Sequence, residues 1–582
     1  MRRPSITPRR STWPLAGGRT RLNHGNSSVA SRKTSSPFTA SPPRLSPTAA
    51  RLPPPTPGRR DPPLRWHRRW AGSLSLLGAK RGEGSVQTSV GRRIHGPLAL
   101  DGVELAALLN GEVRVAGARK IRGAAIDSRL VGDTPGCAFF ALPGARTDGR
   151  LHAVAALHAG AAAVVISRAD GSESAEVAEA LRALDDAAKS AGASVVVVPN
   201  ALHALGTAAT AWRARFDLEV IGVTGSVGKT TTKEFITAAL GGVAEGCYST
   251  PGNANNEIGL PLALLNLPDE ATRFVAEMGM YVLGDIRSLC AIAQPRIGVV
   301  TAVDAVHAER AGGIAAIESG KGELIAALPA DGQAILAADD PRVVAMGSRG
   351  PARVRTAGRA ADADVAIRDA HLIERSSHTS VLLATTEGEV QLELPVFGAH
   401  FAQAAALAIA VAQACGVSAT IAGERLHSAS LPSGRATTQL AGGVRIIDDT
   451  YNAAPRSMAA ALATLAACTG QRFAVLGAMG ELGDWSAAAH EAIGRTAASS
   501  ELAMLIVIGS EADGIAEGAR AGGMSVEQIL RLPADAAGLA AAAGMLGDRV
   551  APGSTILVKA SRSVGLERLV ETLMKQLGGV AQ

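Results

Sequence analysis

The feature that most constrains this chain is a glycine-rich segment in which a predicted strand, 218–223, leads into a predicted helix, 232–240. Residues 222–231 read G-V-T-G-S-V-G-K-T-T. Glycines let backbone N–H groups converge on phosphate oxygens, and the start of the following helix favours negative charge. Five residues separate Gly222 from Gly228, one more than the strict phosphate-loop pattern has, so a turn that binds nothing is the alternative. The strand before the segment and the helix after it favour a nucleotide site.

The residue types in this segment also predict how it would bind ATP. Lys229 would reach the β- and γ-phosphates, and the hydroxyl of Thr230 would hold Mg²⁺. We therefore expect ATP contacts along the whole loop, from Gly225, Ser226, Val227, Gly228, Lys229, Thr230 and Thr231.

Short apolar runs alternate with Ala- and Leu-rich helical stretches along most of the chain, for example at 162–166, 195–198 and 504–508. Strands separated by helices imply parallel sheets that bind ligands at the carboxyl ends of their strands. The sequence therefore predicts an α/β protein with three domains, at 96–215, 216–427 and 428–582. The central domain would hold the phosphate loop on a parallel sheet like that of P-loop ATPases, and the C-terminal domain would be Rossmann-like.

The distribution of charge argues against a nucleic-acid partner. Residues 1–100 hold 19 of the 58 Lys and Arg residues and only two acids, Asp61 and Glu83. The rest of the chain holds 39 basic and 50 acidic residues, so it is acidic despite the formal net charge of +6. No stretch reaches the roughly 18 consecutive apolar residues of a membrane span. Five dispersed cysteines without a C-x-x-C pair argue against a disulfide framework or a zinc site.

Residues 1–95 are rich in Arg, Pro and Ser and show neither strand nor helix periodicity, which predicts a disordered extension. Two interpretations of this extension stay open. Its composition is that of an organelle transit peptide, which would place the protein in a plastid. Alternatively, it is non-coding sequence read from a start codon too far upstream. We favour the second interpretation and a cytoplasmic protein.

Two further candidate ligands follow predicted strands. Glu277 ends the apolar run 273–276, which places its carboxylate at the carboxyl end of a strand, near the loop. Mg²⁺ prefers oxygen ligands, so Glu277 is a candidate metal ligand, with an ordinary surface or capping glutamate as the alternative. His307 follows the run 297–301 and, on its own, is more often a structural histidine.

The loop pattern G-x-T-G-S-x-G-K-T-T resembles the ATP loop of the Mur ligase family, the ATP-dependent peptide ligases of peptidoglycan synthesis. Further blocks follow in the family's order over about 97–582: 126–129 with 148–149, 250–261, 448–458, and 476–483 with His490. The blocks N-N-E-I-G-L-P and D-D-x-Y-N-A-x-P-x-S-M are similar to the member that adds D-alanyl-D-alanine. They are less similar to the members that add diaminopimelate or glutamate.

This resemblance implies a function. The chain would ligate D-alanyl-D-alanine to UDP-N-acetylmuramoyl-tripeptide through an acyl-phosphate, as a monomer that uses ATP and Mg²⁺. The N-terminal α/β domain would bind the uridine nucleotide of the precursor. Phosphoryl transfer asks the protein mainly for positioning and for positive charge around the γ-phosphate, so no nucleophilic side chain is required.

The resemblance also implies roles for single residues. His307 matches the family's metal-binding histidine, and Lys321 matches the lysine that reacts with CO₂ to form a carbamate, an anionic ligand for a second Mg²⁺. The implied metal ligands are Thr230, Glu277, His307 and Lys321. The implied catalytic residues are Lys229, His307, Lys321 and Lys559.

In the third domain three charged residues are placed to meet the nucleotide. Arg435 would reach the γ-phosphate, Asp449 would accept hydrogen bonds from the ribose hydroxyls, and Lys559 would stabilise the developing phosphate charge. Surface charges on a sheet edge are the alternative for each of them. The implied substrate-binding residues are Ser128, Arg129, Asn255, Asn256, Tyr451 and Asn452.

Several positions depart from the family's pattern, and most of them lose a hydrogen-bonding side chain. They are Arg150, Ala302, Ala337, Phe401, Ala404, Ala454, Ala478 and Ala560. Each lost ligand contact would cost roughly 0.5–1.5 kcal/mol, which leaves open a non-catalytic, nucleotide-binding homologue. A related ligase with a different amino-acid donor is a further alternative, although the third domain has no D-N-P-R donor motif. The charged residues are intact, which favours an active enzyme.

Overall fold

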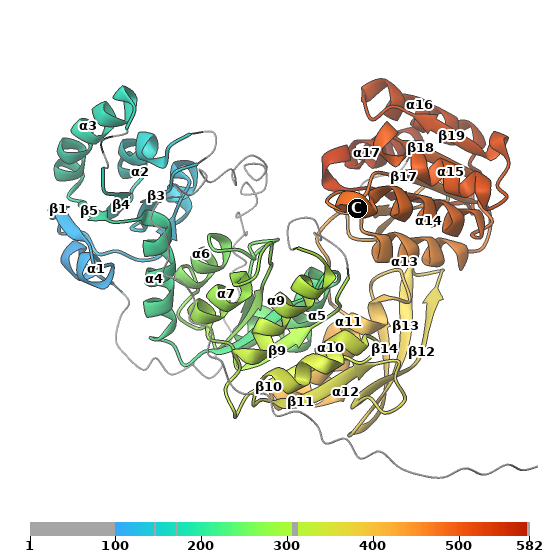
Figure 1. Ribbon diagram of the computed structural model, residues 1–582, viewed down its shortest axis with the longest axis horizontal. Helices are drawn as coiled ribbons and strands as arrows, with labels where there is room; N and C mark the ends of the chain where they lie inside the picture. Colours follow the sequence, from blue (N-terminus) through green and yellow to red (C-terminus); the bar gives the residue numbers. More distant parts are fainter. Residues whose placement is uncertain (1–98, 145–146, 170, 172, 305–311, 579–582) are drawn as a thin grey trace, which may run out of the picture. The chain divides into compact units, whose positions relative to one another are not determined.

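The structure, a computed structural model, describes residues 99–578 except 145–146, 170, 172 and 305–311. The predicted disordered extension, 1–95, and His307 lie outside the described residues. Three sheets occupy successive parts of the chain, and helices connect most of their strands (Figure 1). The α/β class predicted from the sequence is confirmed.

The first sheet has five strands in the order β1-β5-β4-β3-β2. Strands β2 to β5 are parallel, whereas β1 pairs with β5 in the antiparallel sense. The strands are β1 (Glu112–Val115), β2 (Ala124–Ala125), β3 (Ala138–Ala141), β4 (Ala163–Ser167) and β5 (Ser194–Val198). The helices are α1 (Gly102–Leu108), α2 (Ala153–His158), α3 (Ala175–Ala191) and α4 (Ala201–Arg213). The apolar runs 162–166 and 195–198 therefore form strands, as predicted.

The second sheet has nine strands in the order β14-β13-β12-β11-β10-β9-β6-β8-β7. Its parallel part contains β6 (Glu219–Thr224), β7 (Cys247–Ser249), β8 (Arg273–Glu277), β9 (Ile297–Val300), β10 (Gln333–Ala337), β11 (Arg353–Gly358) and β12 (Val365–Ile373). The helices are α5 (Lys229–Ala239), α6 (Gly259–Leu265), α7 (Asp285–Ala293), α9 (Ile314–Ala326), α10 (Pro341–Ala345), α11 (Phe401–Ala414) and α12 (Ala419–Leu426).

One edge of this sheet departs from the purely parallel arrangement that we predicted. Two strands, β13 (His378–Thr385) and β14 (Gly388–Leu394), continue from β12 as an antiparallel meander. In β14 buried and exposed residues alternate, because one face of the meander packs on the core and the other meets solvent. The phosphate loop lies at the opposite side of the sheet, where the strands are parallel.

The third sheet has six strands in the order β15-β16-β20-β17-β18-β19, and only the edge pair β15–β16 is antiparallel. The strands are β15 (Thr437–Ala441), β16 (Val444–Asp449), β17 (Arg472–Gly477), β18 (Met504–Ile508), β19 (Ile529–Leu532) and β20 (Thr555–Lys559). The helices are α13 (Pro455–Ala466), α14 (Ser486–Ala498), α15 (Asp513–Ala521), α16 (Ala536–Arg549) and α17 (Glu567–Gln576).

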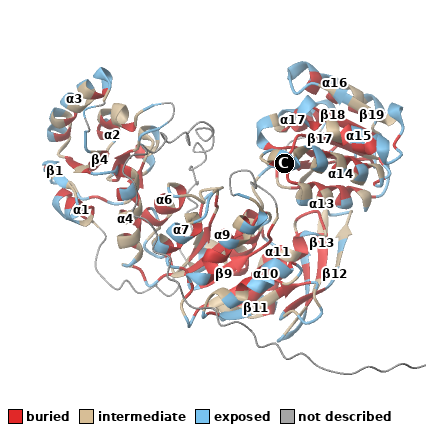
Figure 2. Cartoon of the chain, viewed as in Figure 1, coloured by how far each residue is buried: buried red, intermediate tan, exposed pale blue. Residues whose placement is uncertain are grey.

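The central strands are apolar along their whole length because helices cover both faces of the parallel sheets. All four residues of β9 and all five of β18 are buried. Figure 2 shows the buried residues along the strands and the inner sides of the helices, with exposed residues on the outer sides. This packing fixes the carboxyl ends of neighbouring strands, from which the candidate site is built.

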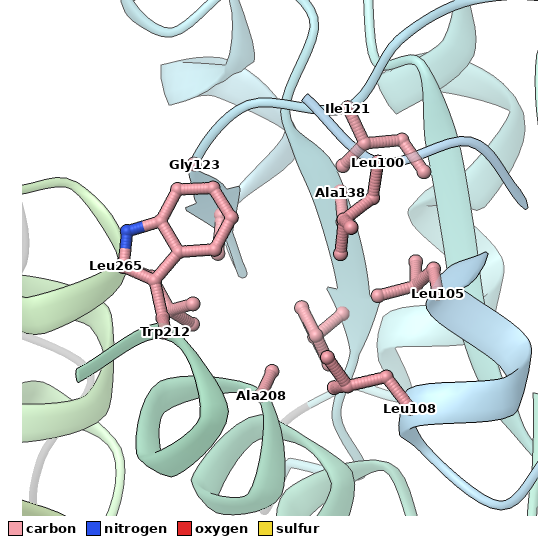
Figure 3. A pocket seen from close by; sticks show the side chains of 11 residues that line it. Leu100, Leu105, Leu108, Ile121, Gly123, Ala138, Ala208, Trp212 and Leu265 are labelled. Atoms are coloured by element: carbon pink, nitrogen blue, oxygen red, sulfur yellow. The ribbon is translucent and has the colours of Figure 1, made fainter. Parts of the chain in front are cut away.

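A small cavity of about 20 Å³ lies where α1, α4 and α6 meet (Figure 3). Its lining contains no charged side chain, and the Nε1–H of Trp212 is buried without a hydrogen-bond partner among the described residues. About one water molecule would fit in this volume, so the cavity is a packing defect with no room for a substrate. Within the described residues, no helix has the length and apolar character needed to cross a bilayer.

Candidate nucleotide and metal site

The phosphate loop connects the end of β6 to the start of α5, and two glycines shape it. Gly225 has φ of +152°, and a Cβ atom there would lie 1.9 Å from the Oγ1 atom of Thr301. Gly228 has φ of +83° and is the N-cap of α5, which begins at Lys229 rather than at the predicted Thr232. Since only glycine adopts such conformations without strain, the sequence G-S-V-G-K is what allows the loop to wrap the start of the helix.

The segment that directly follows β9 holds the loop in place. The N–H of Ser226 donates to the carbonyl of Ala302 at 2.8 Å, and the hydroxyl of Thr301 donates to the carbonyl of Val227 at 2.5 Å. The Ser226 hydroxyl also exchanges hydrogen bonds with the backbone of Asp304, at 2.8 and 2.9 Å. Bonds within the protein therefore hold the loop in shape, so little conformational entropy would be lost when phosphate binds.

Lys229 folds back over the loop. Its ammonium donates to the carbonyl of Gly225 at 2.8 Å. Burial lowers the pKa of Lys229, the carboxylate of Glu277 raises it, and the guanidinium of Arg435 lowers it, with a net shift downward. The ammonium thus lies among the charges that the sequence predicted to meet ATP.

Thr230, in the first turn of α5, and Glu277, at the carboxyl end of β8, form a buried pair. The Thr230 hydroxyl donates to Oε2 of Glu277 at 2.8 Å, and the Asn255 amide donates to Oε1 of the same carboxylate at 2.8 Å. Glu277 ends β8, as predicted, and is 1% exposed. Two neighbouring oxygen ligands of an octahedral Mg²⁺ at 2.0–2.1 Å lie about 2.9 Å apart. The Thr230–Glu277 pair therefore fits a Mg²⁺ ion.

Lys321 is buried on α9, at 4% exposure, where glycines flank it. Gly320 lets the helix approach Met280, since a Cβ atom there would lie 2.4 Å from the methionine methyl carbon. Burial, and next the positive charge of Lys229, hold the pKa of Lys321 well below its usual range. Among the described residues no three His, Cys, Asp or Glu side chains form a metal cluster.

Two of the predicted ATP contacts in the third domain are joined to each other. The ammonium of Lys559 donates to Oδ2 of Asp449 at 2.6 Å and to the carbonyl of Asn452 at 2.8 Å. Lys559 is only 2% exposed, and both residues end parallel strands, β20 and β16. The predicted roles of Lys559 and Asp449 are thus coupled, because whatever moves one charge changes the surroundings of the other.

Two arginines lie against the ring of Tyr451. The guanidinium carbon of Arg435 lies 4.0 Å from the ring centroid, and that of Arg562 lies 5.7 Å away. Nε of Arg435 is buried and has no hydrogen-bond partner among the described residues. Such stacking on an aromatic ring restricts the orientation of a guanidinium. Arg562 was not among the predicted site residues, although it follows the strand that ends at Lys559.

The predicted substrate residues of the first domain lie at the end of β2. Ser128 begins a short 3₁₀ helix that the Asp127 side chain caps through the N–H of Arg129. The side chain of Arg129 pairs with Asp127 at 2.5 Å and is largely exposed. Arg150, where the family pattern has histidine, forms ion pairs with Asp148 at 2.8 Å and Glu173 at 3.2 Å.

Some predicted and some unpredicted side chains shape the loop that precedes α6. Oδ1 of Asn256 accepts from the N–H groups of Ile258 and Gly259, so this side chain caps the helix start. Sequence reasoning missed Thr250, whose hydroxyl accepts from the N–H of Glu277 at 3.0 Å, and Lys233, which is fully buried. Lys233 carried a signal, since it stands one helical turn after Lys229, on the same face of α5.

Most of the departures from the family pattern occupy buried, apolar surroundings. The ring of Phe401 packs on Phe235 of α5, with the ring centroids 6.4 Å apart. The other apolar departures are also buried, namely Ala302, Ala337, Ala404, Ala454, Ala478 and Ala560. In this chain these positions contribute to packing, whereas the charged residues of the site are retained.

Comparison with protein families matches three consecutive parts of the chain. Residues 120–213 match "Mur ligase family, catalytic domain", residues 223–412 match "Mur ligase middle domain", and residues 434–562 match "Mur ligase, glutamate ligase domain". The middle match contains the phosphate loop, Glu277 and Lys321.

Curated relatives cover nearly the whole described chain. It is 35% identical to the UDP-N-acetylmuramoyl-tripeptide–D-alanyl-D-alanine ligase of Mycobacterium tuberculosis over 481 residues, 78% of this chain and 93% of that protein. The ligase of the same name from Escherichia coli is 31% identical over 482 residues, 81% of this chain and 98% of that protein.

Solved structures agree with these matches. A crystal structure of MurF from Acinetobacter baumannii superposes with a TM-score of 0.71 at 26% identity, over 82% of this chain and 99% of that one. MurF from Thermotoga maritima in complex with ADP gives 0.66 at 29% identity, over 78% and 98%. With the phosphate loop, the buried Thr230–Glu277 pair and three family matches in the expected order, the chain belongs to the Mur ligase family.

Proposed function

We propose that this protein ligates D-alanyl-D-alanine to UDP-N-acetylmuramoyl-tripeptide and converts ATP to ADP and phosphate, as the predicted resemblance implied. The relatives that carry this activity in their names match at 31–35% identity over 93–98% of their length. The observation that carries the proposal is the phosphate loop with Thr230 and Glu277 paired at 2.8 Å beneath it. Because the reaction uses ATP and a UDP-linked precursor, we assign it to the cytoplasm.

The loop is proposed to bind the phosphates of ATP through the backbone from Gly225 to Thr231 and the ammonium of Lys229. The first turn of α5 presents N–H groups that have no partner within the helix, and its dipole favours the negative charge of phosphate. Lys229 would exchange its contact with the carbonyl of Gly225 for one with the phosphates. The Thermotoga maritima relative is in complex with ADP, which supports the use of ATP by this chain.

Thr230 and Glu277 are the proposed Mg²⁺ ligands, joined by Lys321 after carbamylation and by His307. A bound Mg²⁺ would neutralise charge on the β- and γ-phosphates and draw them into line for transfer. The Asn255 amide fixes the Glu277 carboxylate from the side away from Thr230. A carboxylate held in this way keeps the orientation that a ligand needs.

Lys321 is suited to carbamylation because its environment favours the neutral amine. Only the neutral form has the lone pair that attacks CO₂, and its pKa lies well below the usual range. The nitrogen attacks the carbon of CO₂, an N–H proton leaves to solvent, and an anionic carbamate forms. That anion would relieve the positive charge that Lys229 imposes on this position.

The proposed reaction has two steps. A carboxylate oxygen of the tripeptide attacks the γ-phosphorus of ATP, the bond to ADP breaks, and an acyl-phosphate forms. The amine of D-alanyl-D-alanine then attacks the acyl carbon, the carbon–oxygen bond to phosphate breaks, and phosphate leaves. Lys229, Arg435 and Lys559 are the cations that would stabilise the phosphate charge in these steps.

The remaining predicted residues are assigned to the two substrates. Ser128 and Arg129 would meet the uridine nucleotide, since they begin the 3₁₀ helix that follows strand β2 of the first sheet. Asp449 would accept from the ribose of ATP, and Tyr451 and Asn452 would line the acceptor side of the third sheet. Asn255 and Asn256 act on substrate through the loop that they stabilise.

A ligation assay tests the function. Purified protein is incubated with ATP, Mg²⁺, the UDP-linked tripeptide and a panel of amino-acid and dipeptide donors, and the product is identified by mass. We expect the pentapeptide product and phosphate in equal amounts, with D-alanyl-D-alanine only. Phosphate release with either substrate alone, or ligation of a single amino acid in preference, would contradict the proposal.

A further inference from the structure

The ammonium of Lys233 is the most completely buried charge near the site, at 0% exposure. It donates to the carbonyl of Thr250 at 2.6 Å and to the carbonyl of Gly252 at 3.0 Å, and it pairs with the Glu234 carboxylate at 2.9 Å. A lysine ammonium has three N–H donors, of which two are used in these hydrogen bonds, and the Glu234 carboxylate compensates the charge. Burying a charge costs free energy, even when polar partners compensate part of it. The position of Lys233 therefore indicates a specific role.

Its position links the two halves of the proposed metal site. Lys233 stands on α5, which also carries Thr230. The carbonyls that Lys233 holds belong to the segment 250–252, and the Thr250 hydroxyl in turn accepts from the N–H of Glu277 at 3.0 Å. A few residues later, the carbonyl of Asn255 accepts from the N–H of Gly279 at 2.8 Å.

The segment 250–255 therefore surrounds Glu277. The Thr250 hydroxyl accepts from the N–H of Glu277, and the Asn255 carbonyl accepts from the N–H of Gly279, two residues further on. The Asn255 amide also donates to the Glu277 carboxylate itself. On its outer side the segment is fastened to α5 by Lys233. The Lys233 ammonium thus connects the helix that carries Thr230 to the loop that holds Glu277.

We propose that Lys233 is a positioning residue of the magnesium–ATP site, which holds the segment 250–255 so that the Glu277 carboxylate stays opposite the Thr230 hydroxyl. This inference rests on the proposed function, because it assigns Thr230 and Glu277 to Mg²⁺. Lys233 contacts neither substrate nor metal, and it acts through Thr250 and Asn255. Its loss would leave the loop glycines and Lys229 in place and disturb only the carboxylate side of the site.

The first measurement needs no turnover. Hydrogen exchange of metal-free protein reports on the N–H groups of Glu277 and Gly279, which Thr250 and Asn255 hold. In Lys233→Met these two amides are expected to exchange at least about 10-fold faster than in wild type, as for the loss of roughly 1.4 kcal/mol of protection. Unchanged protection of both amides in a folded Lys233→Met protein would overturn the proposal.

The second measurement follows ligation as a function of Mg²⁺ at saturating ATP. Lys233→Met should raise the half-saturating Mg²⁺ concentration about 10-fold or more, because the segment 250–255 is then no longer held to α5. A Mg²⁺ requirement equal to that of wild type in Lys233→Met would contradict the role. If wild type itself does not ligate, the proposed function fails, whereas the exchange experiment still tests the positioning of Glu277.

Two further variants separate positioning from general stability. Thr379 lies on the distant strand β13 of the same sheet and is fully buried, and its hydroxyl donates to the carbonyl of Val396 at 2.7 Å. Thr379→Val removes this hydrogen bond. It should lower stability and leave the Mg²⁺ requirement unchanged, and a shift equal to that of Lys233→Met would count against a specific role. If Lys233→Met does not fold, Thr250→Val removes the next link and should raise the Mg²⁺ requirement, and an unchanged requirement there would overturn the proposal.

Discussion

The hydroxyl of Thr230 gives the sharpest test of the metal site, because valine replaces it with a methyl group of the same shape. Thr230 is 4% exposed, and its only side-chain hydrogen bond among the described residues is the 2.8 Å donation to Glu277. The variant Thr230→Val therefore keeps the packing of α5 and removes one oxygen. A hydrogen bond to a charged group contributes about 1.5–3 kcal/mol, and we take the same scale for a lost oxygen ligand.

This free energy corresponds to a rise of about 10- to 150-fold in the half-saturating Mg²⁺ concentration. The assay is phosphate release with all substrates present, titrated with Mg²⁺ at saturating ATP, and thermal unfolding of the metal-free protein checks the fold. Thr230→Ser, which retains the hydroxyl, should behave as wild type. The assignment is refuted if Thr230→Val folds and its Mg²⁺ requirement equals that of wild type.

Three further predictions follow from the burial and charges of the site. Gly225→Ala brings a Cβ atom to 1.9 Å from the Thr301 hydroxyl at a φ of +152°, so the loop must shift. Calorimetry should show that ATP binding is lost, and strain should lower the free energy of unfolding by about 1–3 kcal/mol. Tight ATP binding by this variant would refute the loop geometry. The lowered pKa of Lys321 means that the unfolded chain binds its proton more readily below pH 10.5, so wild type loses stability as pH falls toward the folded pKa. In CO₂-free and metal-free buffer Lys321→Met should therefore be more stable than wild type at neutral pH. This difference in unfolding free energy should shrink by up to about 1.4 kcal/mol per pH unit as the pH rises toward 10.5. A difference that does not change with pH would contradict a depressed pKa of Lys321. Lys559→Met leaves the Asp449 carboxylate without its buried partner and should lower the free energy of unfolding by about 3–5 kcal/mol. Adding Asp449→Asn to this variant should restore most of the stability but not the ligation activity.

The parts of the fold that depend on local pattern were predictable from the sequence. The apolar runs before the phosphate loop and before Glu277 form β6 and β8, and the predicted runs 297–301 and 504–508 likewise form β9 and β18. These strands are buried on both faces, so their composition alone identifies them. The start of α5 was placed three residues late, because the segment G-K-T-T has no apolar periodicity and its helical start depends on Gly228 as N-cap.

The parts that depend on distant residues were not predictable. The order β10-β9-β6-β8 of the second sheet is one of them, because it is set by pairing between strands far apart in the chain, such as Ile221 of β6 with Ile297 of β9. In the same way, Lys559 was predicted as a catalytic residue and Asp449 as an ATP contact, each on its own, although they form one ion pair across 110 positions of the chain. Lys233 was overlooked because its hydrogen-bond partners are backbone carbonyls, which every residue has, so no residue type in the sequence identifies them.

The central claim is that the loop at 222–231 binds ATP so that a substrate carboxylate is activated by phosphorylation. The most direct test labels both carboxylate oxygens of the tripeptide's terminal residue with heavy oxygen and follows the label through one round of ligation. An acyl-phosphate mechanism predicts that the released phosphate carries one labelled oxygen and that the new amide retains the other. Phosphate without label, in a reaction that still forms the amide bond, would contradict the account.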